Sequence, residues 1–253
     1  MNGFAVFARK EAREILRTWR IWVLPGILVF FALIGPVLAR FTPEIVGAVA
    51  GNQLGGFTLP TPTYLDAYAQ WVKNLSQIAL FALIIIYGSI VSAESRSGTA
   101  VLVLTKPVSR ASFVIAKVAV HSVFLATLVV IGTLLTWGLT AVVFGTAPGS
   151  ALWSAALVWL VLGVLFIALM TLLSVLIGSA AGAAGAGLGA YALVSIAAIW
   201  KPLERYSPAG LATQPASLAA GKDVAVLWPV LTSLVLAVAL VALAAWAFRR
   251  RDL

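Results

Sequence analysis

Apolar residues are grouped into six long blocks along the chain, and most charged residues fall between these blocks. A helix needs about 20 apolar residues to cross the hydrocarbon core of a bilayer, and each block approaches or exceeds that length. The blocks lack the alternation of polar and apolar residues that is typical of barrel strands. The pattern therefore predicts an all-α membrane protein with six transmembrane helices, covering approximately residues 21–38, 74–93, 113–144, 152–177, 181–200 and 224–248.

A different pattern precedes the first block. Between residues 4 and 20, apolar residues recur at spacings of three and four, and charged residues occupy the other side of the predicted helix. Aromatic residues on one face and basic residues on the other suit the boundary between lipid and water. We expect an amphipathic interfacial helix here. A basic flank that only fixes the orientation of the first span is the alternative interpretation.

Residues 42–70 form a polar segment with several prolines and glycines, which we expect to lie outside the membrane. Its last part has helical spacing of large residues and predicts a helix that continues into the second span. Tyrosine and tryptophan at such a position are typical of anchors at the membrane interface. A role in gating a substrate is the alternative. The residues concerned are Tyr64, Leu65, Tyr68 and Trp71.

Two further stretches stand out after the fourth span. Residues 178–190 are rich in glycine and alanine, and no lysine follows them as a phosphate-binding loop requires. Small residues four apart, as in the pairs Gly178/Gly182 and Gly185/Gly189, instead predict close packing of membrane helices. Residues 201–223 contain three prolines, which predict several short pieces forming an external cap or a re-entrant hairpin.

Composition and charge agree with a membrane protein and fix its orientation. The chain of 253 residues is 62% hydrophobic and 10% charged, unlike ordinary soluble domains. With the predicted spans, twelve basic and four acidic residues lie on one side (+8), and five basic and four acidic on the other (+1). This bias places both termini in the cytoplasm of a multi-pass protein of the inner (plasma) membrane. A net charge of +9 distributed in this way does not indicate nucleic acid.

The third predicted span is long and carries two titratable residues near its start. A helix of 32 residues would be about 48 Å long, more than a core of about 30 Å requires. We expect its first turns to project into the cytoplasm, where Lys117 extends to the head groups at little cost. His121 has no second histidine, no cysteine and no carboxylate nearby in the sequence, so we expect a packing residue rather than a ligand.

Candidate chemistry is scarce in this chain. Residues 152–200 contain no charged residue, whereas ion-coupled carriers need polar or acidic groups near the midplane. The chain also lacks a nucleotide-binding motif, cysteine and paired deep acids, which argues against an enzyme and against a cofactor on this chain. We therefore expect the energy to come from a separate ATPase. A non-transporting membrane anchor or scaffold for a partner ATPase remains the alternative.

The polar passage between the second and third spans, residues 94–117, is the best candidate for function. A turn at Ser97-Gly98, a helix N-cap at Thr99 and a break at Pro107 predict a short helix across the cytoplasmic end of the bundle. Its apolar residues should press on a partner or on the membrane surface. A loop whose basic residues only set topology is the alternative. The candidate residues are Glu94, Arg96, Gly98, Thr99, Val101, Leu102, Leu104, Pro107 and Arg110.

The order and spacing of these residues, with Lys117 after them, resemble the loop between the second and third membrane helices of ABC-2 type permeases, the membrane subunits of ATP-binding cassette transporters. The resemblance implies that this loop carries a coupling helix that docks on a separate ATPase subunit, where ATP and magnesium bind. It also implies a dimer, either of identical chains or with a closely related second permease, and export rather than import.

Within this resemblance, each residue has an expected role. Glu94 and Arg96 would fix the loop through ion pairs or helix-end contacts, and Gly98 would give the turn. The apolar residues Val101, Leu102 and Leu104 would fill a groove on the ATPase, and residues 107–110 would redirect the chain into the third span. Nothing in the sequence identifies the transported substrate.

Overall fold

The computed structural model describes residues 3–18, 20–50, 60–96 and 110–250. Within these ranges the chain is entirely helical and contains no strand. The helices, in chain order, are α1 (Gly3–Arg17), α2 (Arg20–Ala50), α3 (Tyr64–Asn74), the π-helix η2 (Leu75–Ala79), α4 (Leu80–Tyr87), α5 (Ser92–Arg96), α7 (Arg110–Phe144), α8 (Gly149–Leu176), α9 (Ala180–Ala197), α10 (Lys201–Tyr206), the 3-10 helix η3 (Pro208–Ala212), α11 (Gln214–Ala219) and α12 (Leu227–Arg249).

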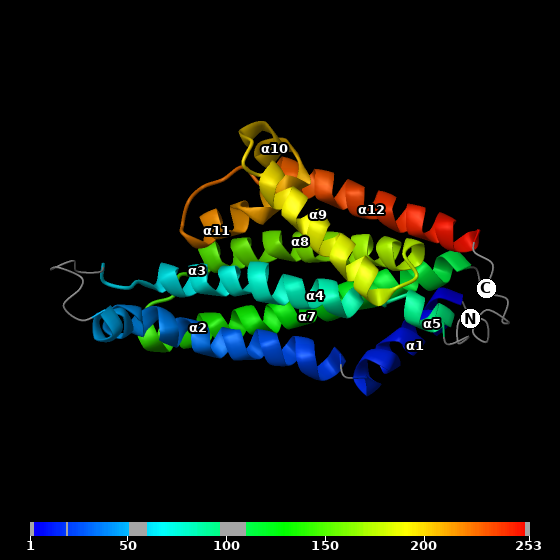
Figure 1. Ribbon diagram of the computed structural model, residues 1–253. Helices are drawn as coiled ribbons and strands as arrows, with labels where there is room; N and C mark the ends of the chain where they lie inside the picture. Colours follow the sequence, from blue (N-terminus) through cyan, green and yellow to red (C-terminus); the bar gives the residue numbers. More distant parts are fainter. Residues whose placement is uncertain (1–2, 19, 51–59, 97–109, 251–253) are drawn as a thin grey trace.

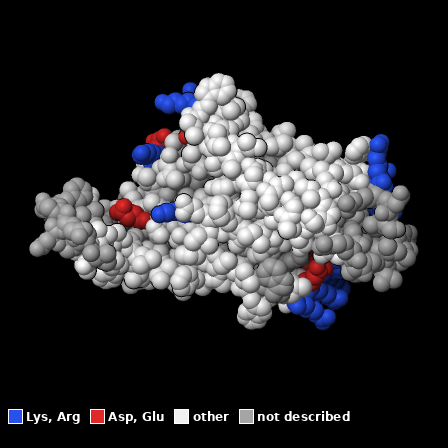
Figure 2. Space-filling model, in the orientation of Figure 1, with Lys and Arg blue, Asp and Glu red and all other residues white. Residues whose placement is uncertain are grey.

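Six helical stretches among the described residues are long and apolar enough to cross a membrane, as the sequence predicts. One of them, Tyr64–Glu94, combines α3, η2, α4 and the start of α5. The space-filling view in Figure 2 shows charged side chains gathered toward the two ends of the molecule, with an uncharged belt between them. The chain is therefore a multi-pass membrane protein.

The long helices pack around α8, which contacts α4, α7, α9, α11 and α12 (Figure 1). The start of α7 and the end of α12 lie together, because Arg110 Nη1 donates a hydrogen bond to the carbonyl of Arg249 at 3.3 Å. The rings of Phe113 and Phe248 stack next to this contact, with centroids 5.4 Å apart. Helix α1 packs against the same part of α7, so both ends of the chain approach one end of the bundle.

Helix α2 continues to Ala50, twelve residues beyond the expected end of the first span at residue 38. It includes Pro36 and Pro43, although the sequence places residues 42–50 in an external segment beyond the first span. A proline removes one backbone hydrogen bond, which membrane helices tolerate when nearby groups compensate. In the turn before Pro43, the hydroxyl of Thr42 donates to the carbonyl of Leu38 at 2.6 Å.

Helix α3 runs into the second span as expected, but two of its aromatic residues are not interfacial anchors. Tyr68 and Trp71 are fully buried. The hydroxyl of Tyr68 donates to the carbonyl of Pro148 at 3.1 Å, and Trp71 Nε1 donates to the hydroxyl of Thr133 at 3.2 Å. The anchor interpretation is wrong for these two residues, because this face of α3 packs on α7 and α8 instead of facing the membrane interface.

The glycine-rich helix α9 packs through a different glycine from those expected. A Cβ added at Gly185 or Gly189 would meet nothing within 4 Å, and one at Gly182 would meet only residues of the preceding turn. At Gly187, an added Cβ would lie 2.9 Å from Ile84 and would also collide with Met170. Close approach of α9 within the chain therefore occurs at Gly187 and at the small residues Ala180 and Ala184, which a Cβ added at Gly88 would meet at 2.6 Å and 3.3 Å, whereas Gly182, Gly185 and Gly189 make no such approach to another helix.

Residues 201–219 form three short helical pieces, each with a proline in its first turn, as the three prolines predict. The pieces fold back onto the long helices. Helix α11 packs on α8 and α3, and η3 packs on α12. The segment therefore covers one side of the bundle, in the half away from α1 and α5 (Figure 1).

Candidate functional site

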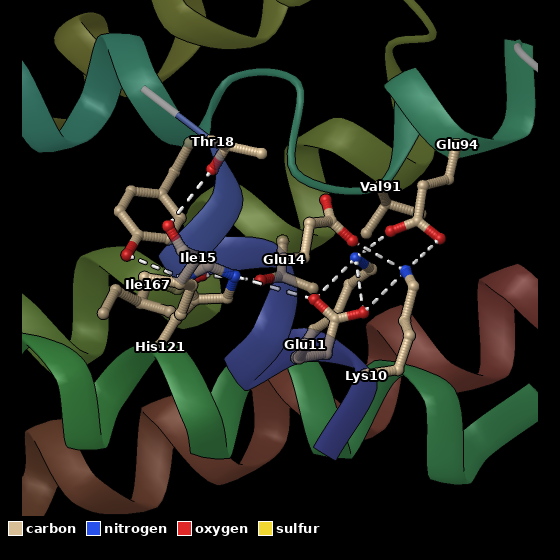
Figure 3. A network of polar contacts seen from close by, with 12 residues as sticks. Lys10, Glu11, Glu14, Ile15, Thr18, Val91, Glu94, His121 and Ile167 are labelled. Carbon is tan, nitrogen blue, oxygen red and sulfur yellow. Dashed lines mark hydrogen bonds and ion pairs between the residues drawn. The ribbon is translucent and has the colours of Figure 1, made fainter. Parts of the chain in front are cut away.

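Five charged side chains from three helices meet at the end of the bundle that holds α1 and α5 (Figure 3). Helix α1 supplies Lys10, Glu11 and Glu14, α5 supplies Glu94, and α7 supplies Lys117. We call these five residues the ion network. Figure 3 shows the carboxylates of Glu11 and Glu94 directed toward the ammonium group of Lys10. The network therefore connects three segments that are far apart in the sequence.

Lys117 is the central cation of the ion network. Its side chain is fully buried, and Nζ lies 3.0 Å from each carboxylate oxygen of Glu11. The same ammonium also donates to Oε1 of Glu94. The expectation that Lys117 extends to the head groups is therefore wrong. Helix α1 folds over the first turns of α7 and excludes solvent from them, so the lysine is satisfied by carboxylates instead of water.

Lys10 completes the network from the partly exposed side. Its Nζ lies 2.7 Å from Oε2 of Glu94, 2.8 Å from Oε2 of Glu14 and 3.0 Å from Oε1 of Glu11. The Glu14 contact joins successive turns of α1, whereas the Glu94 contact crosses to α5. Both carboxylate oxygens of Glu94 thus accept from a lysine, one on α1 and one on α7.

The buried face of α1 explains how Glu11 reaches this position. Phe7, Glu11 and Ile15 are spaced four residues apart, and each is 3% exposed or less. They form one stripe that faces α7, where the ring of Phe7 meets Phe113 edge to face at 5.6 Å. Glu11 is not among the residues predicted from the sequence. The available signal was its place on the apolar stripe of an amphipathic helix, where an acid needs a partner.

His121 lies one helical turn beyond Lys117 and next to the network. Its Nε2 is 3.7 Å from Oε2 of Glu11, and its Nδ1 is 3.0 Å from the hydroxyl of Tyr87. The two rings also meet edge to face, with centroids 4.9 Å apart. The carboxylate that the sequence around His121 lacks comes from α1, which is distant in the sequence.

The electrostatic environment favours the charged forms of the α1 residues. Burial raises the pKa of Glu11, but neighbouring His121 and the ammonium groups of Lys117 and Lys10 outweigh it, and the pKa falls well below its ordinary value of 4.5. Burial lowers the pKa of Lys10, but Glu11, Glu14 and Glu94 outweigh it, and the pKa rises above its ordinary value of 10.5. Both groups are therefore ionised near neutral pH.

The three carboxylates of the network do not need a metal ion for compensation. One oxygen each of Glu11, Glu14 and Glu94 lies within 4.8 Å of the others, close enough to share a cation. The ammonium of Lys10 already lies within 3.0 Å of an oxygen of each of them. Because a lysine fills the position that a cation would take, we assign no metal site here.

The residues predicted from the loop are placed as follows. Glu94 is in the ion network, Arg96 ends α5, and Arg110 begins α7 and contacts the end of α12. The other predicted residues lie outside the described ranges, namely Gly98, Thr99, Val101, Leu102, Leu104 and Pro107. Glu94 and Lys117 thus lie on either side of residues 97–109 in the sequence, and they are ion-paired.

Comparisons with known proteins agree with this architecture. Residues 53–253 match the model of a family described as a protein of unknown function, DUF2705. Over 202 residues the chain is 31% identical to the probable ABC transporter permease protein NosY of Stutzerimonas stutzeri, covering 76% of this chain and 67% of that protein. The chain belongs to the DUF2705 family and to the ABC transporter permeases related to NosY. The relationship to NosY is distant.

Two further relatives show how much of the chain is shared with similar proteins. The probable ABC transporter permease NosY of Pseudomonas aeruginosa is 31% identical over 199 residues, which cover 72% of this chain and 63% of that protein. An uncharacterised transmembrane protein of Bacillus subtilis, YxlG, is 27% identical over 255 residues, covering 95% and 96% of the two chains. The permease thus spans about two thirds of the length of the NosY proteins and nearly all of YxlG.

The ion network of this permease connects three helices through buried or partly buried charges. A hydrogen bond or ion pair between charged, buried groups is short and directional, and it resists separation because each charge would lose its compensation. Glu94 and Lys117 hold the adjoining ends of the second and third spans together, Glu11 attaches α1 to α7, and Lys10 attaches α1 to α5. The ion network therefore joins α1, α5 and α7 through ion pairs.

We expect the thermal stability of the purified permease to be highest between about pH 5 and pH 10. The lowered pKa of Glu11 stabilises the fold above 4.5, and this contribution is lost as the pH falls through the folded-state pKa. The raised pKa of Lys10 stabilises the fold below 10.5, and this contribution is lost as the pH rises through its folded-state value. The measurement is the unfolding temperature as a function of pH.

Two variants separate this contribution from the titration of other acids. Glu11→Gln should reduce the loss of stability on acidification. The carboxylate of Glu44 is exposed and lies 3.5 Å from Arg40. Glu44→Gln should therefore leave the fall of the unfolding temperature at low pH unchanged. If the unfolding temperature falls equally at low pH in the wild type and in Glu11→Gln, Glu11 is not the source of the acid sensitivity.

Proposed function

We propose that this chain is the permease subunit of an ABC-2 type transporter that works as an exporter. Two copies, or this chain and a closely related second permease, form the translocation pathway, and a separate ATPase subunit hydrolyses ATP with magnesium. The whole chain is one transmembrane domain with both termini in the cytoplasm. The relationship to NosY supports the family, and the ion network on either side of residues 97–109 is the observation that carries the mechanism.

In this mechanism, closure of the ATPase subunits pushes the short helix expected between residues 99 and 104. The apolar residues Val101, Leu102 and Leu104 contact the ATPase, and Gly98 and Pro107 set the direction of the chain. The push reaches the membrane because Glu94 and Lys117 tie the two adjoining spans together. The loop contacts the ATP-bound and ATP-free states of the ATPase differently, and this difference shifts the permease between its inward-facing and outward-facing states.

Helix α1 takes part in this movement as the interfacial helix. Its arginines Arg9, Arg13 and Arg17 are exposed, while Glu11 faces the bundle. Exposed basic residues beside a membrane containing anionic lipids hold the helix at the surface. Through the ion network, a movement of α1 at that surface is transmitted to the cytoplasmic ends of α5 and α7.

We expect replacement of Leu102 by aspartate, or of Gly98 by valine, to uncouple ATP hydrolysis from transport. Aspartate removes an apolar contact to the ATPase, and valine opposes the turn. The experiment co-expresses the permease with its ATPase subunit, identified by co-purification, and measures hydrolysis and ATP-driven transport in sealed vesicles. Transport should fall at least tenfold while hydrolysis no longer responds to the permease.

The matched control is Leu203→Asp in α10, at the opposite end of the bundle, which should leave coupling intact. Unchanged coupling in both loop variants would refute the proposed transmission. A complex that binds the ATPase but moves nothing on addition of ATP would instead identify the chain as a membrane anchor or scaffold.

A further inference from the structure

A groove with an almost entirely apolar lining lies between α7, α8 and α12. Its volume is about 440 Å³, within the range of pockets that hold a small ligand. The groove opens to the outer surface of the bundle, where Val238 is 70% exposed. Its floor contains the small residues Ala168 and Ala237, which leave the space that larger side chains would fill. The lining residues are Ile115, Val118, Val164, Ala168, Leu234, Ala237, Val238, Val241, Ala242 and Ala245.

The length of the groove matches one leaflet of a bilayer. Along α12 it extends from Leu234 to Ala245. At 1.5 Å per residue this is about 16 Å, close to half of a hydrocarbon core of about 30 Å. The groove begins about a third of the way along α12 and ends one turn before Arg249, at the end of the bundle that holds α1. It therefore lies mainly in one leaflet, the cytoplasmic one in the proposed orientation.

Basic side chains lie just beyond the end of the groove. Arg249 and Arg250 are exposed, and Arg250 lies over the ring of Trp246 at 4.1 Å. Arg110 comes from the neighbouring α7 and donates to the carbonyl of Arg249 at 3.3 Å. Figure 2 shows basic side chains at this end of the molecule. The groove, which is long enough for one acyl chain, therefore ends beside a cluster of positive charge at the level of the head groups.

We propose that this groove binds one acyl chain of an anionic phospholipid, whose phosphate is held by Arg249 and Arg250. The charge next to the groove selects this occupant. A neutral hydrophobic molecule would gain nothing from the arginines. A second copy docked here about a two-fold axis would bring the arginines of both α12 helices close together, where like charges repel.

The test uses the purified full chain in a mild detergent and counts retained lipid by native mass spectrometry. The probes are phosphatidylglycerol and phosphatidylcholine with identical acyl chains. We expect the wild type to retain phosphatidylglycerol preferentially. Ala242→Leu fills the groove and should lower its retention about tenfold or more. Ala239→Leu is the matched control, because Ala239 is exposed on α12 but does not line the groove.

The role of the arginines is tested in the same way. The double variant Arg249→Gln/Arg250→Gln should reduce the preference for phosphatidylglycerol by about 25-fold, roughly fivefold for each arginine near the surface. The control Lys201→Gln/Arg205→Gln changes the same charge at the other end of the bundle and should have no effect. Equal retention in Ala242→Leu and Ala239→Leu would overturn the proposal. So would conversion of a dimer to a monomer by Ala242→Leu, which would show that a second copy covers the groove.

Discussion

Replacing Lys117 with methionine should lower the free energy of unfolding of the permease by about 3–5 kcal/mol. Methionine keeps an unbranched side chain of similar length but removes the ammonium that lies between Glu11 and Glu94. Of the two lysines of the ion network, only Lys10 then remains beside its three carboxylates, and Glu11 is 99% buried. The loss should be visible in the denaturation of the purified protein in a defined detergent, followed by tryptophan fluorescence.

Lys73→Met is the matched control for this prediction. Lys73 also lies in a membrane-spanning helix, but it is exposed and has no ion pair within the described ranges. Its replacement should change the free energy of unfolding by no more than about 0.5 kcal/mol. If Lys117→Met costs no more than Lys73→Met, the ion network does not stabilise the fold.

A double variant separates the loss of the attraction between Glu11 and Lys117 from the cost of leaving the Glu11 carboxylate buried without its partner. Adding Glu11→Gln to Lys117→Met removes one carboxylate that would otherwise remain buried without enough compensation. We expect the double variant to be less destabilised than the sum of the two single variants, by about 0.5–3 kcal/mol. Strict additivity would mean that Glu11 and Lys117 do not interact, contrary to their separation of 3.0 Å.

The sequence predicts the helices of this permease well, because each long apolar block is a local property. A bilayer imposes a minimum length on a helix, and that length can be counted from residue to residue. The helical entry from Tyr64 into the second span is predicted for the same reason. The end of α2 is not, since prolines that break soluble helices are tolerated in a long membrane helix.

The candidate site could not be predicted from local sequence patterns in the same way. Lys117 and Glu11 are 106 residues apart, and nothing local to either residue names the other as its partner. The resemblance to ABC-2 permeases led to Glu94, which the structure places in the ion network, but it gave no role to Lys10 or Glu11. The position of an amphipathic helix on the bundle decides which of its charges become buried, and that position depends on tertiary packing.

The glycines of α9 illustrate the same limit on a smaller scale. Each residue of a helix turns the side-chain direction by about 100°, so residues two apart lie on nearly opposite faces. Gly185 and Gly189 are each two residues from Gly187, which is the glycine that contacts Met170 and Ile84. The composition of the stretch predicts a close approach, but the facing side is set by the neighbouring helices.

A leucine at Gly132 should lower the free energy of unfolding by about 1–3 kcal/mol or more, through overpacking between α7 and α3. A Cβ added at this buried glycine would lie 2.5 Å from Cη2 and 2.8 Å from Cζ2 of Trp71. The indole cannot move away without cost, because it is fully buried and its Nε1 donates to Thr133 at 3.2 Å. The measurement is again denaturation in a defined detergent, with the fluorescence of tryptophan as an additional local probe.

Gly138→Leu provides the control on the same helix. Gly138 is exposed, and an added Cβ would meet nothing within 4 Å, so the change should be neutral or stabilising by up to about 1 kcal/mol through helix propensity. The two variants make the same chemical change in one helix and differ only in what they contact. If both have the same effect, helix propensity or insertion into the membrane controls the result. A loss confined to Gly132→Leu means that the contact with Trp71 fixes how closely the second and third spans pack, and hence whether a displacement of one moves the other.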